Sequence, residues 1–131
     1  MSAGNSLSNI KVRDIMSKRL ISVTPETTVF QIANMMNEGR IGAVFVKKNG
    51  GDDGIITDRD FAIKIATKKL SLDTPVDQVA SYPLETIDAG ESIVNAAVQM
   101  SAKNIRKLGV VEGSKIIGII TSTDLVKQIK N

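Results

Sequence analysis

The sequence predicts an α+β protein made of two similar units, each with the order strand, helix, strand, strand, helix. Its 131 residues suffice for one compact body, and 42% of them are hydrophobic, which is ordinary for a globular protein. The chain also matches itself without a gap when it is shifted by 64 residues. In each copy, short β-prone runs alternate with segments that place their apolar residues on one helical face.

The repeat shows itself as identical residues at equivalent positions. Most pairs are apolar, as a shared core requires, but Gly-Ile-Ile-Thr-x-x-Asp recurs with its polar residues intact. One copy alone buries too little surface to be stable, so we expect the two to pack through their sheets into one globular body with two equivalent clefts. The identical pairs are Val12/Val76, Ser17/Ser81, Leu20/Leu84, Ala33/Ala97, Met36/Met100, Ile41/Ile105, Val46/Val110, Gly54/Gly118, Ile55/Ile119, Ile56/Ile120, Thr57/Thr121, Asp60/Asp124 and Ile65/Ile129.

The first elements of each copy are a short strand and an amphipathic helix. Residues 20–23 are β-prone and end at Thr24-Pro25, where Thr suits a helix cap and Pro suits a first helical turn. The helix has one apolar face, and Gly39 supplies its stop. This face consists of Val29, Ile32, Ala33 and Met36 in the first copy and of Ile93, Ala96, Ala97 and Met100 in the second.

Two further strands and a second helix complete each copy. Residues 43–46 and 55–56 read as strands joined by a turn rich in Gly and Asp, and residues 108–111 and 116–120 repeat this pattern. A helix is expected after Thr57 and again after Thr121. Its core contacts are predicted to be Phe61 and Ile65 in the first copy and Leu125 and Ile129 in the second.

The domain boundaries follow from the repeat and from the turn signals. We expect a disordered segment over residues 1–9, a first unit over residues 10–69, a linker over residues 70–75 and a second unit over residues 76–131. No apolar run approaches the length that spans a bilayer, and the first residues lack the apolar stretch of a secretory signal. The expected location is the cytoplasm.

The composition argues against several classes of function. The chain has no His and no Cys, which removes the commonest general base, the thiol nucleophile and the usual zinc ligands, so an enzyme is not expected. The net charge of +3 is modest, and Lys and Arg are scattered along the chain. With one Tyr, three Phe and no Trp, the chain has few aromatic platforms for single-stranded nucleic acid.

The recurring Thr-x-x-Asp is the most informative polar motif. Its spacing is that of a helix start, where the hydroxyl caps the helix and the carboxylate suits the positive end of the dipole. A ligand is the alternative, since free N–H groups favour phosphate and a carboxylate accepts hydrogen bonds from ribose hydroxyls. The duplication favours a nucleotide. Arg59 adds a cation in the first copy, where the second has Thr123, although a solvated surface charge explains Arg59 equally well.

These residues resemble a tandem pair of cystathionine β-synthase (CBS) domains, also called a Bateman module. The resemblance rests on VRDIMSKRLISVTPETTV, on the closing GIITDRDF and on its second copy GIITSTDL, and it covers roughly residues 10–130. It implies a regulatory module, not an enzyme, that binds an adenosine-containing ligand such as AMP, ADP, ATP or S-adenosylmethionine between the two units. Magnesium is a possible companion of a polyphosphate.

The resemblance implies two clefts, each made by residues from both copies. The first would join Ile55, Thr57, Arg59, Asp60, Tyr82, Pro83, Ile105 and Arg106. The second would join Met16, Lys18, Ile41, Gly42, Ile119, Thr121, Thr123 and Asp124. No metal-ligating residues are predicted.

The first cleft is predicted to be the better nucleotide site. Arg59 and Arg106 can grip phosphate oxygens, and Tyr82 is the sole aromatic wall for a purine, although it can equally cap a surface turn before Pro83. The second cleft has Lys18 and the hydroxyl of Thr123, which suit a less charged ligand or none.

The regulated partner cannot be read from the sequence, and a homodimer is expected by analogy with free-standing modules of this kind. Two alternatives stay open. One is a nucleic-acid-binding protein that uses the mild positive charge. The other is a purely structural dimer with empty clefts.

Overall fold

The structure is a computed structural model that describes residues 7–129. Its contacts divide the chain into two compact units. We call Ile21–Leu84 the middle unit, and we call Met1–Leu20 together with Glu85–Asn131 the end unit. The α+β class and the presence of two similar units are as predicted from the sequence.

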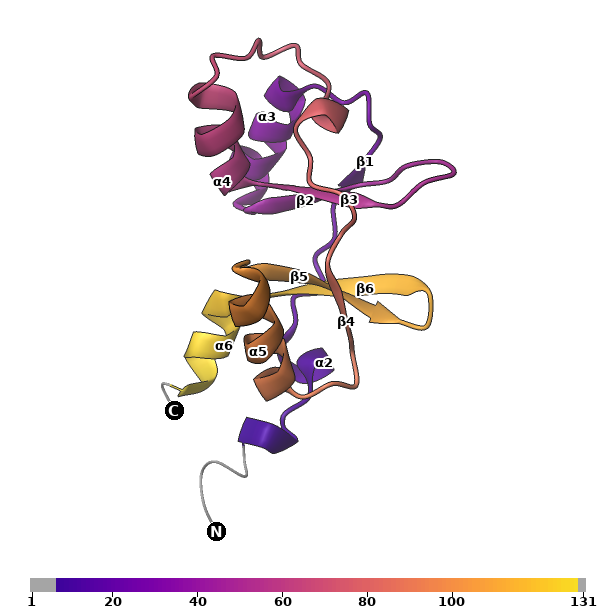
Figure 1. The fold of residues 1–131 in the computed structure, drawn as a ribbon, viewed down its shortest axis with the longest axis vertical. Helices are drawn as coiled ribbons and strands as arrows, with labels where there is room; N and C mark the ends of the chain where they lie inside the picture. The colour runs from indigo at the N-terminus through magenta and orange to yellow at the C-terminus, as the bar shows by residue number, and fades with distance from the viewer. Residues whose placement is uncertain (1–6, 130–131) are drawn as a thin grey trace. The chain divides into compact units, whose positions relative to one another are not determined.

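The middle unit has a three-stranded sheet in the order β1 (Ser22–Val23), β2 (Ala43–Val46) and β3 (Gly54–Thr57). β1 runs parallel to β2, and β3 runs antiparallel to it. The helix α3 (Val29–Gly39) connects the two parallel strands, and the short helix α4 (Asp58–Asp60) follows β3 directly. Both helices lie on the same face of this sheet (Figure 1).

The end unit repeats this design with β4 (Thr86–Asp88), β5 (Lys107–Glu112) and β6 (Lys115–Thr121). β4 pairs with β5 in parallel and β5 pairs with β6 in antiparallel, as in the middle unit. The helices α5 (Ile93–Lys103) and α6 (Ser122–Ile129) cover one face of the sheet (Figure 1). The predicted element order is therefore confirmed in both copies.

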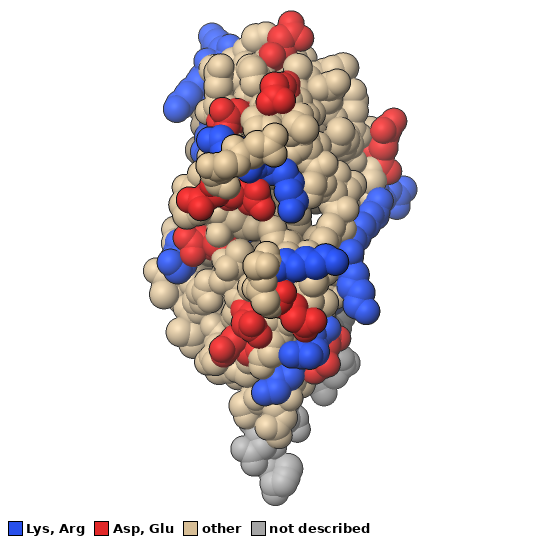
Figure 2. Space-filling view, turned by 90° about the vertical axis from the view of Figure 1, so that its right-hand side faces the viewer, with Lys and Arg blue, Asp and Glu red and all other residues tan. Residues whose placement is uncertain are grey.

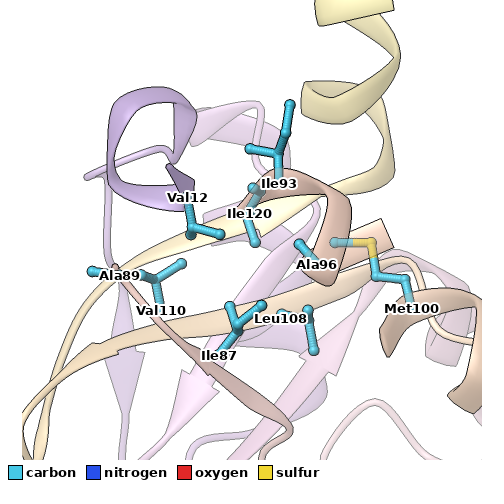
Figure 3. Close-up of a cluster of buried hydrophobic side chains, with 9 residues drawn as sticks. All are labelled: Val12, Ile87, Ala89, Ile93, Ala96, Met100, Leu108, Val110 and Ile120. Atoms are coloured by element: carbon cyan, nitrogen blue, oxygen red, sulfur yellow. The ribbon is translucent and has the colours of Figure 1, made fainter. Parts of the chain in front are cut away.

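Each unit has its own apolar core, and each core contains residues from both sequence repeats. In the end unit, Val12 of α2 (Val12–Ile15) packs among side chains of α5 and the sheet (Figure 3). In the middle unit, Val76 of the 3₁₀-helix η2 (Val76–Gln78) and Val79 belong to the core. Val12 and Val76 are fully buried, and burying a Val side chain stabilises by about 1.5–3 kcal/mol.

The segments that precede β1 and β4 are thus exchanged between the repeats. Ser17 precedes β1 but exchanges backbone hydrogen bonds with Ile119 of β6, at 2.8 and 2.9 Å. Ser81 precedes β4 but exchanges hydrogen bonds with Ile55 of β3, at 2.9 and 3.1 Å. The compact units therefore differ from the contiguous ranges 10–69 and 76–131 that the repeat predicts.

The predicted linker, residues 70–75, lies inside the middle unit. Its carbonyls cap the start of α3, since Val29 N–H donates to Thr74 O at 2.9 Å and Phe30 N–H donates to Leu72 O at 3.1 Å. Helix N-termini leave such N–H groups unpaired within the helix, so this contact satisfies two of them. The chain passes between the units instead at residues 20–21 and 84–85.

Several local predictions were wrong. The cap of α3 is Thr28, not Thr24, and it forms a capping box with Gln31. The helix does end at Gly39, as predicted, and Arg40 follows in the left-handed conformation. In the segment predicted to be disordered, residues 1–6 lie outside the described residues and residues 7–9 are helical.

The second helix also differs from the prediction in each copy. In the middle unit, α4 continues as the π-helix η1 (Phe61–Ala66), in which Ile65 is buried as predicted. In the end unit, Leu125 packs against the core, but Ile129 is 72% exposed at the last residue of α6. None of the helices in residues 7–129 is both long and apolar enough to cross a membrane.

Candidate functional site at the two strand-helix junctions

The predicted Thr57 and Asp60 come together at the junction of β3 and α4. The Thr57 N–H donates to Asp60 Oδ2 at 2.8 Å, and the Thr57 hydroxyl lies 3.3 Å from the same oxygen. The Asp60 side chain is only 15% exposed. A partly buried carboxylate needs such donors, because burial of an unpaired charge is costly. The junction thus fixes the position of one carboxylate in the middle unit.

A lysine that was not predicted as a site residue completes this junction. Lys64 Nζ lies 3.4 Å from Asp60 Oδ1, and it donates to Val79 O at 2.9 Å and to Ser81 Oγ at 3.1 Å. Asp60 and Lys64 stand four residues apart, the spacing at which opposite charges meet on a helix. That spacing was readable in the sequence.

The end unit repeats the junction between β6 and α6. The Thr121 N–H donates to Asp124 Oδ2 at 2.9 Å, and the Asp124 N–H donates back to Thr121 Oγ1 at 3.2 Å. This reciprocal pair is a capping box, so the helix-capping interpretation of Thr-x-x-Asp is confirmed. Arg59 and Thr123, at equivalent positions, are both exposed. Capping does not prevent a further role, because a carboxylate oxygen accepts more than one hydrogen bond.

The residues that enter the second strand contact the junction of their own unit. The Asp58 N–H donates to Gly42 O at 3.0 Å, and the Ser122 N–H donates to Arg106 O at 2.9 Å. Ile41 and Gly42 therefore adjoin the Thr57 junction, and Ile105 and Arg106 adjoin the Thr121 junction. The predicted pairing of each set with the junction of the other unit stays a prediction.

The segments ahead of β1 and β4 lie beside the strands that carry the junctions. Gly54 of β3 faces Tyr82, and a Cβ built on Gly54 would lie 2.6 Å from Tyr82 Cδ1. Gly118 of β6 faces Met16, where a Cβ would lie 2.6 Å from the Met16 sulfur. Glycine is required at both positions because the neighbouring segment lies too close to leave room for a Cβ. The structure thus places Tyr82 and Pro83 in the same unit as Thr57, and Met16 and Lys18 in the same unit as Thr121.

Tyr82 is held by charged neighbours on two sides. Its hydroxyl donates to Asp77 Oδ1 at 2.9 Å, and Lys48 Nζ lies 4.2 Å from the ring centroid. Lys48 also pairs with Asp77 at 3.4 Å. Burial and, after it, the hydrogen bond to Asp77 together raise the pKa of Tyr82 to about 12. The same hydrogen bond is the main cause that lowers the pKa of Asp77. These contacts order the aromatic wall predicted for a purine.

Titration of the phenol tests this arrangement, because the chain contains one Tyr and no Trp. The phenolate absorbance should reach half of its change near pH 12 instead of near the ordinary value of 10.0. Since the folded pKa is raised, the contribution of Tyr82 to stability is present below pH 10.0 and is lost as the pH rises toward about 12.

A variant pair assigns the cause of this shift. Asp77→Asn should lower the titration midpoint, but not fully to 10.0, because burial is the first cause. Asp73→Asn changes an exposed carboxylate elsewhere in the same unit and should leave the midpoint unchanged. A wild-type midpoint at the ordinary value would show that Tyr82 is solvated and unpaired.

The end unit also carries an open hollow of about 450 Å³ next to its predicted site residues. It is lined by Arg13, Asp14, Met16, Lys18, Glu112 and Ile117. Arg13 is positioned by a 3.4 Å hydrogen bond from Nε to Ala89 O and pairs loosely with Glu112 at 3.8 Å. Met16 and Lys18 are predicted residues of the second cleft, whereas the other four lining residues were not predicted as site residues. Within residues 7–129, no group of three or more acidic side chains could hold a metal ion.

Comparison with known proteins identifies the family. The family model described as "CBS domain" matches twice, at residues 12–67 and at residues 76–131. The chain belongs to the CBS domain family. It is a CBS domain pair, a kind of module that is generally regulatory and ligand-binding. The resemblance noted in the sequence is therefore confirmed.

Relatives extend over most of this CBS pair. The CBS domain-containing protein YhcV of Bacillus subtilis is 31% identical over 121 residues, which are 92% of this chain and 86% of YhcV. A crystal structure of an uncharacterized conserved protein from Pyrococcus horikoshii superposes with a TM-score of 0.86 at 25% identity and covers 95% of each chain.

Another solved structure shares the fold at lower identity. The hexameric CBS-CP12 protein from bloom-forming cyanobacteria superposes with a TM-score of 0.85 at 21% identity, over 89% of this chain and 66% of that chain.

Proposed function

We propose that this CBS pair is a regulatory module that binds an adenosine-containing nucleotide, AMP, ADP, ATP or S-adenosylmethionine, and signals to a partner protein. The observation that carries the proposal is the duplicated junction, where Asp60 and Asp124 are each oriented by the N–H and hydroxyl of a Thr. An oriented carboxylate at a helix N-terminus is a ready acceptor for the two hydroxyls of a ribose.

The neighbours of Asp60 favour a phosphorylated ligand in the first site. Arg59 is exposed beside the carboxylate, and Arg106 is expected to add a second guanidinium. Guanidinium groups bind phosphate oxygens in bidentate fashion. Tyr82, which is held by Asp77 and Lys48, supplies an aromatic face for the purine. Magnesium would accompany a polyphosphate through the oxygens of the ligand, since the described residues lack a carboxylate cluster.

Signalling requires that the ligand bind two arrangements of the module with different affinity. We propose that the ligand biases such an equilibrium and that the module assembles as a homodimer. Assembly is supported by the hexameric CBS-CP12 protein, which shares the fold. No catalytic step is proposed, because the chain has no His and no Cys and no activated nucleophile stands beside either Asp.

A thermal-shift panel tests the proposal. We expect at least one of AMP, ADP, ATP and S-adenosylmethionine to raise the melting temperature, because a ligand that selects the folded state stabilises it. At one hundred times the Kd, the gain is about 2.7 kcal/mol, a shift of several degrees for a chain of this size. NAD and inorganic phosphate serve as controls, each with and without magnesium.

Two outcomes would favour the other functions considered. If no adenosine compound shifts the melting temperature, the clefts are empty and the module is structural. If RNA or DNA binds with a steep dependence on salt and without regard to nucleotides, the protein binds nucleic acid. On the face shown in Figure 2, Lys and Arg lie among Asp and Glu instead of forming one continuous basic surface, which disfavours this second outcome.

A further inference from the structure

The two junctions differ in the residue that stands four positions after their Asp. Both oxygens of Asp60 are engaged, since Thr57 donates to Oδ2 and Lys64 Nζ lies 3.4 Å from Oδ1. In the end unit, the position equivalent to Lys64 is occupied by Gln128, which is neutral. The repeat thus keeps the acceptor and the capping hydroxyl in both copies, but only the first copy has a lysine four residues after the Asp, whereas in the second Lys127 follows Asp124 by three residues.

The ammonium of Lys64 is anchored near the Asp60 carboxylate. Besides Asp60, it contacts Val79 O at 2.9 Å and Ser81 Oγ at 3.1 Å. The Lys64 side chain is 34% exposed and is therefore partly buried. Its ammonium contacts three oxygen atoms. A lysine held in this way is a fixed positive charge at the carboxylate, unlike a lysine that moves freely in solvent.

We infer that Lys64 determines which adenosine ligands the Asp60 junction accepts, an inference that rests on the proposed function. A neutral nucleoside shares Asp60 Oδ1 with the ammonium, which makes this oxygen a weaker acceptor for the ribose, and it gains no charge–charge attraction to the ammonium in return. A phosphorylated ligand gains a favourable interaction with the same ammonium. The Asp60 junction therefore selects AMP over adenosine, and the Asp124 junction, which has Gln128 in this place, discriminates less.

The size of the effect follows from the charges involved. A unit charge several ångströms from a phosphate changes the affinity by about tenfold in a partly solvated site. The same charge has a smaller effect in bulk water and a larger one in a dry interior. Removal of Lys64 should improve adenosine binding and weaken AMP binding. Both changes lower the ratio of the two affinities.

The chain supplies matched variants for this test. Lys64→Gln gives the first copy the residue of the second, and Gln128→Lys gives the second copy the residue of the first. Each junction is measured with the other inactivated, so that the first is studied in an Asp124→Ala background and the second in an Asp60→Ala background. Lys68→Gln removes the same charge from an exposed position on the same stretch of chain, and Lys64→Arg keeps the charge.

Calorimetric titration with adenosine and with AMP gives the readout, and circular dichroism verifies that each variant is folded. We expect Lys64→Gln to lower the preference for AMP about tenfold, Gln128→Lys to raise it at the second junction, and Lys68→Gln and Lys64→Arg to leave it nearly unchanged. If AMP binds the wild type but Lys64→Gln keeps the wild-type preference, the inference is wrong and the proposed function stands. If neither compound binds the wild type, both fail.

Discussion

Gly54→Ala should lower the free energy of unfolding by about 1–3 kcal/mol, which is the usual cost of forcing extra volume into a packed site. A Cβ at this position would lie 2.6 Å from Tyr82 Cδ1 and 2.8 Å from the carbonyl oxygen of Ser81. The second contact is with backbone, so rotation of a side chain cannot relieve it. The paired hydrogen bonds between Ile55 and Ser81 should weaken as a result.

Thermal unfolding monitored by circular dichroism measures this effect, and a decrease of roughly 5–10 °C is expected for a chain of this length. Gly51→Ala is the matched control, because the nearest atom to its Cβ would be Lys48 Cδ at 3.6 Å, an ordinary contact. This control should change the melting temperature little. Equal stability of the two variants would mean that the segment carrying Ser81 and Tyr82 does not pack against β3 in solution.

The element order was predictable because each element leaves a local signal. Strand β2 was predicted over residues 43–46, where the structure has it, because a short apolar run between turn residues is characteristic of a buried strand. The junction of Thr57 and Asp60 was predictable for the same reason, since the capping spacing is confined to one helical turn. The cap was predicted at Thr24, although the spacing of Thr28 and Gln31 also matches a capping box.

The exchange of the segments ahead of β1 and β4 does not follow from the hydrophobic pattern, and only the resemblance to CBS pairs implied that Tyr82 joins Thr57 and that Met16 joins Thr121. Val12 and Val76 are identical and equivalent by the repeat, so each would fit the core of either copy. Hydrophobic pattern assigns a residue to a core, but it does not say which of two similar cores receives it. Only the three-dimensional contacts of Ser17 with Ile119 and of Ser81 with Ile55 decide the assignment.

The side-chain network around Tyr82 could also not be predicted from the sequence. Lys48 lies in the turn between β2 and β3, and Asp77 lies in the 3₁₀-helix η2, so no spacing rule joins either residue to Tyr82. By contrast, the asymmetry between Lys64 and Gln128 could have been found by comparing the two copies position by position. The predicted contributions of Ile105 and Arg106 to the Asp60 site stay predictions.

Calorimetric titration of AMP into the wild type, Asp60→Ala, Asp124→Ala and the double variant tests the central claim most directly. Loss of a hydrogen bond to a charged group costs about 1.5–3 kcal/mol, so Asp60→Ala should weaken AMP binding at its site by roughly ten- to hundredfold. The double variant should bind AMP more weakly by this factor at both sites while staying folded by circular dichroism. AMP affinities that are equal in all four proteins would contradict the assignment of the two junctions as nucleotide sites.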